Sequence, residues 1–240
     1  MSDGNESLNL KAASEAAHID ANDLKHCAQR GEIAAEERAG GWFFRRRDID
    51  EWRQRHLLSV RSSELDACHR SMTEELARNG GEARTLVQSL LREEAIDLAL
   101  AAKATAGMIR DMTDLAMRTD LVYDGEALFK ELSAREEVAS TAAGCGAAFL
   151  HPRYHDPYLF EESFIAYGRS LRPVYFGAPD GAPTSHFFLV CATDRDLHLH
   201  ILARLAVLAH GEGLMERLSE AASPADVIAA VREAEAECGR

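Results

Sequence analysis

The residues best suited to chemistry lie between Arg135 and Arg153, where the chain reads REEVASTAAGCGAAFLHPR. Arg135 and His151 lie in this stretch, and a second histidine, His198, begins a later apolar helical pattern. A histidine offers a nitrogen lone pair near neutral pH, and arginine stays charged and presents a planar fork of donors to phosphate oxygens. The combination predicts phosphorylation of His151, with Arg135, His198 and Arg153 balancing the charge of the phosphoryl group.

Two glycines, Gly144 and Gly146, precede the apolar run 147–150. Glycine adopts backbone angles that other residues avoid, and closely spaced backbone N–H groups can bind an anion. We therefore expect this loop to approach the site closely. The alternative is that the two glycines only shape a turn.

Histidine spacing also raises the question of a metal. His151 with His155, and His198 with His200, could be read as ligand pairs. Pro152 interrupts any helix from 151 to 155, and residues two apart on a helix point in different directions. The sequence therefore predicts no metal site and no other cofactor.

Elements that could position these residues follow from the apolar patterns. Short apolar runs bounded by turns predict a sheet with helices on both faces, an α/β (α+β) fold. The expected strands are 147–150, 163–170, 174–178 and 186–193. Helical spacing predicts helices over 96–122, 124–140, 198–221 and 223–237, with Asp124 opening the second and Ser223 capping the last ahead of Pro224.

Composition limits the classes of partner. The chain has 240 residues and a formal net charge of -13, which disfavours coating nucleic acid or anionic membrane by bulk electrostatics. No apolar run approaches the roughly 20 residues needed to span a bilayer, and the polar, acidic start does not resemble a signal peptide. Five cysteines without a CxxC pair argue against a disulfide framework or a cysteine zinc site. We expect a cytoplasmic protein that does not insert into membranes.

The first 58 residues look like a separate module. Helical spacing over 10–19 and 21–31 is followed by an aromatic strand at 42–44 and a helix starting near Asp48, on which Ile49 and Trp52 would face inward. Residues 59–84 are polar and read as a helical linker. We therefore expect three parts: a module over 1–58, a linker over 59–84 and a second domain over 85–240.

The second domain resembles a known family through several motifs. The matching positions are Arg135-Glu136, Ser140-Thr141, Gly144-x-Gly146, His151, Arg153 and His198-Leu199-x-x-Leu202. They are similar to the type-2 EIIA domain of the fructose, mannitol and nitrogen-regulatory branch of the phosphoenolpyruvate-dependent phosphotransferase system (PTS), over about residues 86–234. Leu150 departs from this pattern, because the family usually has proline before the acceptor histidine.

This resemblance implies a mixed sheet between helices and an acceptor role for His151. Its phosphoryl group would come from an HPr-like phosphocarrier protein. His198 and Arg135 would orient and stabilise the phosphohistidine, and Thr141 would support the site.

The first module resembles the excisionase-like, MerR-related winged helix-turn-helix family. That likeness implies a recognition helix over 22–30 and a set of DNA-contacting residues: Lys25, Arg30, Arg45, Arg46 and Arg47. Residues 1–58 hold nine Lys or Arg against eleven Asp or Glu, a balance of 9 - 11 = -2 that disfavours DNA binding. The alternative is a protein-interaction or homodimerisation module.

Together these features predict a cytoplasmic PTS regulatory protein. Phosphorylated on His151, it would relay PTS status to a partner or to DNA through residues 8–58. One alternative is a transport component that passes phosphate to an EIIB partner for sugar uptake. Another is a DNA-binding regulator whose EIIA-like domain is an inactive sensor.

Overall fold

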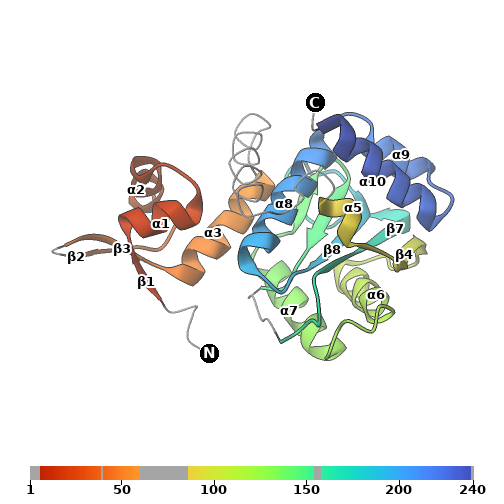
Figure 1. The fold of residues 1–240 in the computed structure, drawn as a ribbon, viewed down its shortest axis with the longest axis horizontal. Coiled ribbons are helices and arrows are strands. Elements are labelled where there is room, and N and C mark those ends of the chain that lie inside the picture. Colours follow the sequence, from red (N-terminus) through yellow and green to blue (C-terminus); the bar gives the residue numbers. More distant parts are fainter. Residues whose placement is uncertain (1–5, 39, 60–85, 154–157, 239–240) are drawn as a thin grey trace. The chain divides into compact units, whose positions relative to one another are not determined.

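The computed structural model describes residues 6–38, 40–59, 86–153 and 158–238 (Figure 1). The chain divides into two compact units, residues 1–57 and 58–240. The predicted linker, 59–84, lies outside the described residues except for Ser59, so its character stays a prediction. In the described parts of the chain, no helix is both long and apolar enough to cross a bilayer.

In its described residues, the first unit contains a three-stranded antiparallel sheet, in the order β1-β3-β2, and three helices. Its elements are β1 (Ser7–Asn9), α1 (Leu10–Ala17), α2 (Ala21–Gln29), β2 (Glu36–Arg38), β3 (Gly41–Arg45) and α3 (Arg46–Ser59). Side chains cap both short helices, since Asn9 accepts from the Ala12 N–H and Asp20 from the Asn22 N–H. Gly31, with φ of 73°, follows α2 where the sequence predicts its end.

A small apolar core holds this unit together. It includes Leu24, Phe44, Ile49 and Trp52, and the predicted inward positions of Ile49 and Trp52 are confirmed. The helix α3 begins at Arg46, two residues earlier than predicted from Asp48. These contacts make the first unit a folded module of its own.

The second unit is built on a mixed five-stranded sheet in the order β4-β7-β8-β6-β5. The pairs β4/β7 and β6/β8 are parallel, and β7/β8 and β5/β6 are antiparallel. The strands are β4 (Leu91–Leu100), β5 (Ala142–Gly144), β6 (Ala147–Leu150), β7 (Phe164–Val174) and β8 (Thr184–Cys191). Between residues 86 and 238, the described helices are α5 (Leu86–Leu90), α6 (Thr105–Met117), α7 (Gly125–Val138), α8 (Arg195–His210), α9 (Leu214–Glu220) and α10 (Pro224–Cys238).

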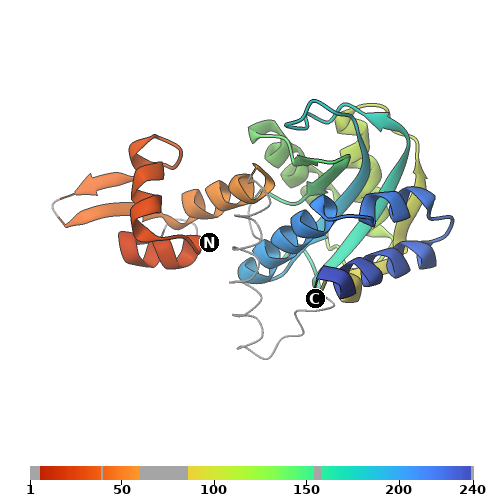
Figure 2. The ribbon, with the colours of Figure 1, turned by 90° about the horizontal axis from the view of Figure 1, so that it is seen from above.

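Helices cover both faces of this sheet, as Figure 2 shows with α6 and α7 on one side and α8 and α10 on the other. Alternate side chains of β8 face opposite ways. Phe187 and Leu189 join the core that includes α6 and α7, whereas Phe188 contacts the rings of Phe149 and Tyr167. The predicted sheet between helices is therefore confirmed.

The predicted helix over 96–122 is wrong in its first part, because residues 91–100 form β4 and the helix α6 covers only Thr105–Met117. Buried Leu91, Ala95, Ile96 and Leu100 recur at intervals that resemble a helical face. Register irregularities in the β4/β7 pairing break the simple alternation of a regular strand. Of these four residues, Ile96 and Leu100 lie in the stretch whose apolar spacing predicts a helix.

Other boundaries differ less. The predicted strand 174–178 is only the end of β7, which stops at Val174, and the short strand β5 and helix α5 were not foreseen. The two predicted caps are confirmed, because Asp124 accepts from the Ala127 N–H and Ser223 accepts from the Asp226 N–H.

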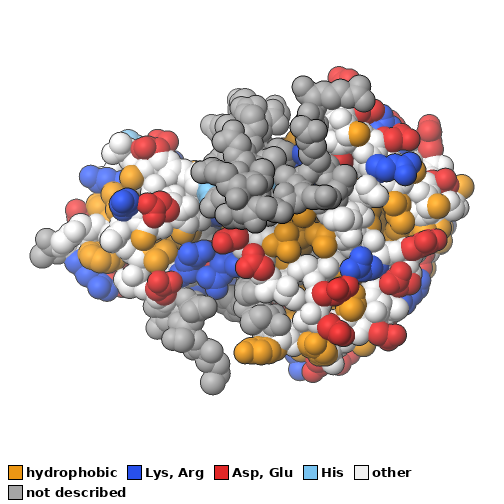
Figure 3. Space-filling view, viewed as in Figure 1, with side chains coloured by type: hydrophobic (Ala, Val, Ile, Leu, Met, Phe, Trp, Pro, Cys, Tyr) orange, Lys and Arg blue, Asp and Glu red, His pale blue; other side chains and the backbone are white. Residues whose placement is uncertain are grey.

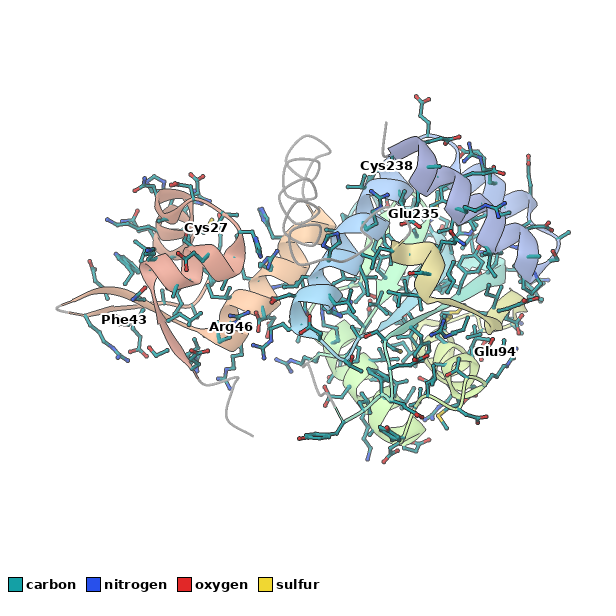
Figure 4. All side chains as sticks on the ribbon, viewed as in Figure 1. Cys27, Phe43, Arg46, Glu94, Glu235 and Cys238 are labelled. Carbon is teal, nitrogen blue, oxygen red and sulfur yellow. The ribbon has the colours of Figure 1, made fainter. Side chains whose placement is uncertain are left out.

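A buried ion pair and two backbone hydrogen bonds join α5, α8 and α10 in the second unit. The Nε of Arg204 on α8 lies 3.3 Å from Oε1 of Glu235 on α10, and both side chains are at most 3% exposed. The Glu235 carboxylate, labelled in Figure 4, also accepts from the backbone N–H groups of Val87 and Gln88 in α5, at 3.1 and 3.0 Å. We call these four residues the terminal clamp.

A second buried network lies between the sheet and α9. The Tyr167 hydroxyl lies 2.8 Å from Nδ1 of His186, and the Ser219 hydroxyl lies 3.2 Å from its Nε2. Arg169 donates to the carbonyl oxygens of Leu218 and Ala221 at the end of α9. Burial, with the nearby Arg169 charge adding to it, lowers the pKa of His186 to about 4.

We expect His186 to make the second unit less stable in acid. Its folded pKa is depressed, so the unfolded chain binds more protons between pH 6.5 and about 4. The free energy of unfolding should therefore fall as pH drops through this window, by about 3 kcal/mol from this residue. Urea denaturation followed by circular dichroism measures it. A His186→Asn variant should lose this part of the pH dependence, and an unchanged slope would contradict the assignment.

Candidate functional site

His151 and His198 meet because they follow neighbouring parallel strands. His151 comes directly after β6, and β8 pairs with β6 in parallel and leads into α8, whose first turn carries His198. The Asp194 side chain accepts from the Leu197 N–H and so fixes the start of α8. The two imidazole rings lie edge to face, with centroids 5.1 Å apart. The structure therefore brings together the two histidines singled out from the sequence.

Arg135 reaches the same place from the last turn of α7. Its Nε donates to Nε2 of His151 at 3.0 Å, and its Nη1 donates to the Ala139 carbonyl oxygen at 2.8 Å. Its side chain is fully buried. A guanidinium at the C-terminal end of a helix is favoured by the helix dipole, which is negative there. The fold thus holds a permanent positive charge against the imidazole.

These contacts fix the proton on His151. Arginine can only donate, so Nε2 of His151 must accept and carries no proton. The other ring nitrogen, Nδ1, lies 2.8 Å from the Phe149 carbonyl oxygen and donates its proton to it. Burial is the main reason that the pKa of His151 lies well below its ordinary value, and the charges of Arg135 and His198 lower it further. His151 is therefore a neutral imidazole with its lone pair on Nε2.

Such an arrangement suits nucleophilic attack by Nε2 on an electrophile that carries negative charge. A neutral nitrogen needs no base to remove a proton, and the adjacent guanidinium can stabilise anionic oxygens. His151 is fully buried, so the site must open to admit a reaction partner.

The predicted glycines do not lie beside His151. Gly144, Cys145 and Gly146 form the turn between β5 and β6, with φ angles of 80°, 48° and 78°. This turn is at the opposite end of β6 from His151, roughly 16 Å away at about 3.3 Å per residue. The expectation of close approach is wrong, because the glycines supply the positive φ angles of a hairpin turn.

Glu136 was part of the sequence motif but was not singled out as a functional residue. Its carboxylate accepts from the Thr141 hydroxyl at 2.6 Å and from the Thr141 N–H at 3.0 Å. Burial raises the pKa of Glu136, and the hydrogen bonds from Thr141 act in the opposite direction. Thr141 itself is buried at the entry to β5. Spacing along the chain gave no signal of this contact, which depends on how α7 leads into β5.

The remaining candidates from the sequence lie on the loop after β6 and on α8. Arg153 is half-buried in the loop two residues after His151, and His155 lies outside the described residues. His200 is buried on α8. The described residues contain no cluster of three or more His, Cys, Asp or Glu side chains placed to hold a metal ion.

The candidate DNA-binding arginines of the first unit lie close to carboxylates. The Nε atoms of Arg45 and Arg47 lie 2.7 and 3.5 Å from the Asp48 carboxylate. The Nε atom of Arg46 lies 3.2 Å from the Asp50 carboxylate. Arg30 pairs with Glu32 at 2.5 Å, and Lys25 is half-buried on α2. On the visible face of this unit, basic side chains lie beside acidic ones (Figure 3). These acids reduce the positive field available to a phosphate backbone.

Known proteins are similar to the second unit in sequence and in fold. The chain is 33% identical over 132 residues to the PTS fructose-specific EIIA component of Haloferax volcanii, covering 53% of this chain and 84% of that protein. The crystal structure of the nitrogen regulatory protein IIA-Ntr from Neisseria meningitidis superposes with a TM-score of 0.55 at 27% identity, covering 61% of this chain and 99% of that one.

A longer relative matches in one segment only. The PTS fructose-specific EIIABC component of Bacillus subtilis is 28% identical over 144 residues, which cover 59% of this chain but 22% of that protein. The profile of the family described as phosphoenolpyruvate-dependent sugar phosphotransferase system, EIIA 2, matches residues 89–234. This segment contains Arg135, His151 and His198 and exceeds half of the chain. The chain therefore belongs to the EIIA type-2 family of the phosphoenolpyruvate-dependent sugar phosphotransferase system.

Proposed function

We propose that this protein is a PTS regulatory protein that accepts a phosphoryl group on Nε2 of His151 from an HPr-like phosphocarrier. The observation that carries the proposal is the hydrogen bond between Arg135 Nε and His151 Nε2, at 3.0 Å, on a ring whose Nδ1 carries the proton. Nε2 attacks the phosphorus of the carrier's phosphohistidine. The new N–P bond forms as the donor N–P bond breaks, and the carrier imidazole leaves with the bonding electron pair.

Arg135 has two successive roles in this step. Before transfer its Nε–H occupies the lone pair of Nε2, so the guanidinium must move before that nitrogen can attack. Afterwards it donates to the phosphoryl oxygens, where a charge of about -1.5 to -2 has arrived. His198, whose ring lies against that of His151, helps to orient the product.

Phosphoryl transfer can be tested directly on the full chain. Phosphoenolpyruvate, Enzyme I and HPr are added, and intact mass spectrometry follows the gain of one phosphate. Phosphohistidine is acid-labile, so brief acid treatment should remove the gain, whereas a phosphoserine would survive. No gain with carriers that phosphorylate a known EIIA protein in parallel would sink the proposal.

We propose that the first unit carries the regulatory role and that residues 1–58 form a winged helix-turn-helix. Residues 59–84 would then be a helical linker, and residues 85–240 the EIIA-like domain. The β1-α1-α2-β2-β3-α3 order of the first unit supports this. The nearby carboxylates favour a protein partner over DNA as the target. Fluorescence anisotropy with a labelled random duplex at low salt distinguishes the two. Binding that is lost in an Arg45→Ala, Arg46→Ala, Arg47→Ala triple variant would establish DNA as the target.

Transport is the second candidate function. The Haloferax volcanii relative is named a fructose-specific EIIA component, and the Bacillus subtilis relative is an EIIABC component. By analogy, His151 would pass its phosphate to an EIIB partner. Adding a purified EIIB domain to the phosphorylated protein tests this, since transfer would move the mass gain from one protein to the other.

A further inference from the structure

Arg135 and Glu136 are consecutive residues of α7, and their side chains begin and end one circuit of hydrogen bonds. The Glu136 carboxylate accepts from the Thr141 N–H and hydroxyl. The Thr141 carbonyl oxygen accepts from the Phe149 N–H at 3.0 Å. The Phe149 carbonyl oxygen accepts from Nδ1 of His151, and Nε2 of His151 accepts from Arg135, which closes the circuit.

The circuit supports a strand that is weak by itself. β5 has three residues, and its pairing with β6 is irregular between Ala142 and Gly144. Short pairings of this kind contribute little stability without further contacts. The hydrogen bonds from Thr141 to Glu136 fix the entry to β5 and with it the carbonyl that holds Phe149. The position of the Phe149 carbonyl therefore depends on α7 as well as on the sheet.

We propose that Glu136 and Thr141 are positioning residues for phosphoryl transfer to His151. Through Phe149 they hold the imidazole as the Nδ1–H tautomer and keep Nε2 aimed at Arg135. Neither residue touches the reacting nitrogen. The kinetic part of this proposal rests on the proposed function, and the tautomer part does not.

The chemical consequence follows from the tautomer. A neutral imidazole protonated on Nε2 has no lone pair there, so it cannot attack through that nitrogen. A shift of the Phe149 carbonyl weakens one of the two contacts that favour a proton on Nδ1, the other being the hydrogen bond that Arg135 donates to Nε2. A displacement of about 1 Å at a reacting atom can cost roughly a hundredfold in rate. Loss of the hydrogen bonds between Glu136 and Thr141, which connect α7 to β5, should therefore slow phosphoryl transfer without removing any reacting group.

The test uses two variants that weaken the circuit at different points. Glu136→Gln replaces one acceptor oxygen by a donor, and Thr141→Val replaces the hydroxyl by a methyl group of similar size. Thr141→Ser restores the hydroxyl and serves as the rescue variant. Glu137→Gln is the matched control, because Glu137 is an exposed neighbour on the same helix. Urea denaturation confirms that each variant is folded under the assay conditions.

The first measurement is the ¹⁵N chemical shifts of the His151 ring in the unphosphorylated full chain, assigned by comparison with a His151→Gln spectrum. The unmodified protein should show a protonated Nδ1 and an unprotonated Nε2. In Glu136→Gln and Thr141→Val the two shifts should move toward each other as the tautomers mix. Thr141→Ser and Glu137→Gln should keep the original pattern.

The second measurement is the initial rate of phosphorylation by phospho-HPr. We expect kcat to fall about tenfold to a hundredfold in Glu136→Gln and Thr141→Val, with KM for the carrier unchanged. Thr141→Ser should recover most of the loss. Unchanged ring shifts in both weakened variants would overturn the proposal, as would unchanged rates in an active protein. If the unmodified protein takes up no phosphate, the proposed function fails, and the ring shifts alone decide whether Glu136 and Thr141 position His151.

Discussion

Replacing His151 by glutamine should abolish phosphate uptake from phospho-HPr, lowering the rate by at least about a thousandfold. Glutamine can still accept a hydrogen bond from Arg135, so the buried guanidinium keeps a partner, but its amide is not a nucleophile. His151 is fully buried and Arg135 contacts its Nε2 directly. The measurement is the intact-mass gain over time at saturating phospho-HPr.

Two comparisons make the His151→Gln result specific. His210→Gln changes an exposed histidine at the end of α8 and should leave uptake at the level of the unmodified protein. His198→Gln should slow uptake without abolishing it, because that ring orients the product and does not attack. Full uptake by His151→Gln would contradict the assignment, and peptide mapping would then locate the acceptor that is used instead.

Replacing Glu235 by alanine should lower the free energy of unfolding of the second unit by about 3 to 5 kcal/mol. The change leaves Arg204 buried without the carboxylate that lies 3.3 Å from it. It also removes the acceptor of the Val87 and Gln88 N–H groups. Removing one partner of a buried pair is costly because the remaining charge stays desolvated. Urea denaturation followed by circular dichroism gives the size of the loss.

Matched controls separate the terminal clamp from a general effect on α10. Glu233→Ala removes a carboxylate from the same helix whose side chain is 57% exposed and pairs with Arg217 at 3.8 Å. Such an exposed pair contributes at most about 1 kcal/mol. Both tryptophans, Trp42 and Trp52, lie in the first unit, so tryptophan fluorescence should keep its midpoint in Glu235→Ala. A loss no larger than that of Glu233→Ala would refute the clamp.

Much of the site could be predicted from residue types. Arg135, His151 and His198 have side chains suited to binding or accepting a phosphoryl group, and the sequence shows these types directly. His151 and His198 converge through the parallel pairing of β6 with β8, and the EIIA resemblance already implied that Arg135 joins them. The tautomer of His151 could not be read from the sequence, since it depends on the position of the Phe149 carbonyl. The prediction that Gly144 and Gly146 approach the site was wrong because it, too, depended on a position in space that the sequence does not give. A glycine pair signals an unusual turn but does not indicate which end of a strand faces the site.

The fold was predictable where the apolar pattern was regular and failed where it was not. β6, the first five residues of β7 and most of β8 are buried on both faces and appear as short apolar runs. β4 lies at the edge of the sheet with an irregular register, and its apolar residues imitate a helix. α5 has only five residues, too few to establish a period. Its place is set by a carboxylate almost 150 positions later, a contact that no local pattern reveals.

The terminal clamp also bears on where the second domain can be cut. The family profile covers residues 89–234, whereas Val87, Gln88 and Glu235 fall just outside that segment. A fragment trimmed to the family limits would keep the Arg204 guanidinium in its interior and discard its counter-ion together with the helix turn that the counter-ion holds. The smallest piece able to fold alone should therefore run from before Leu86 to beyond Glu235. In this protein the limits of sequence similarity are narrower than those of the cooperative folding unit.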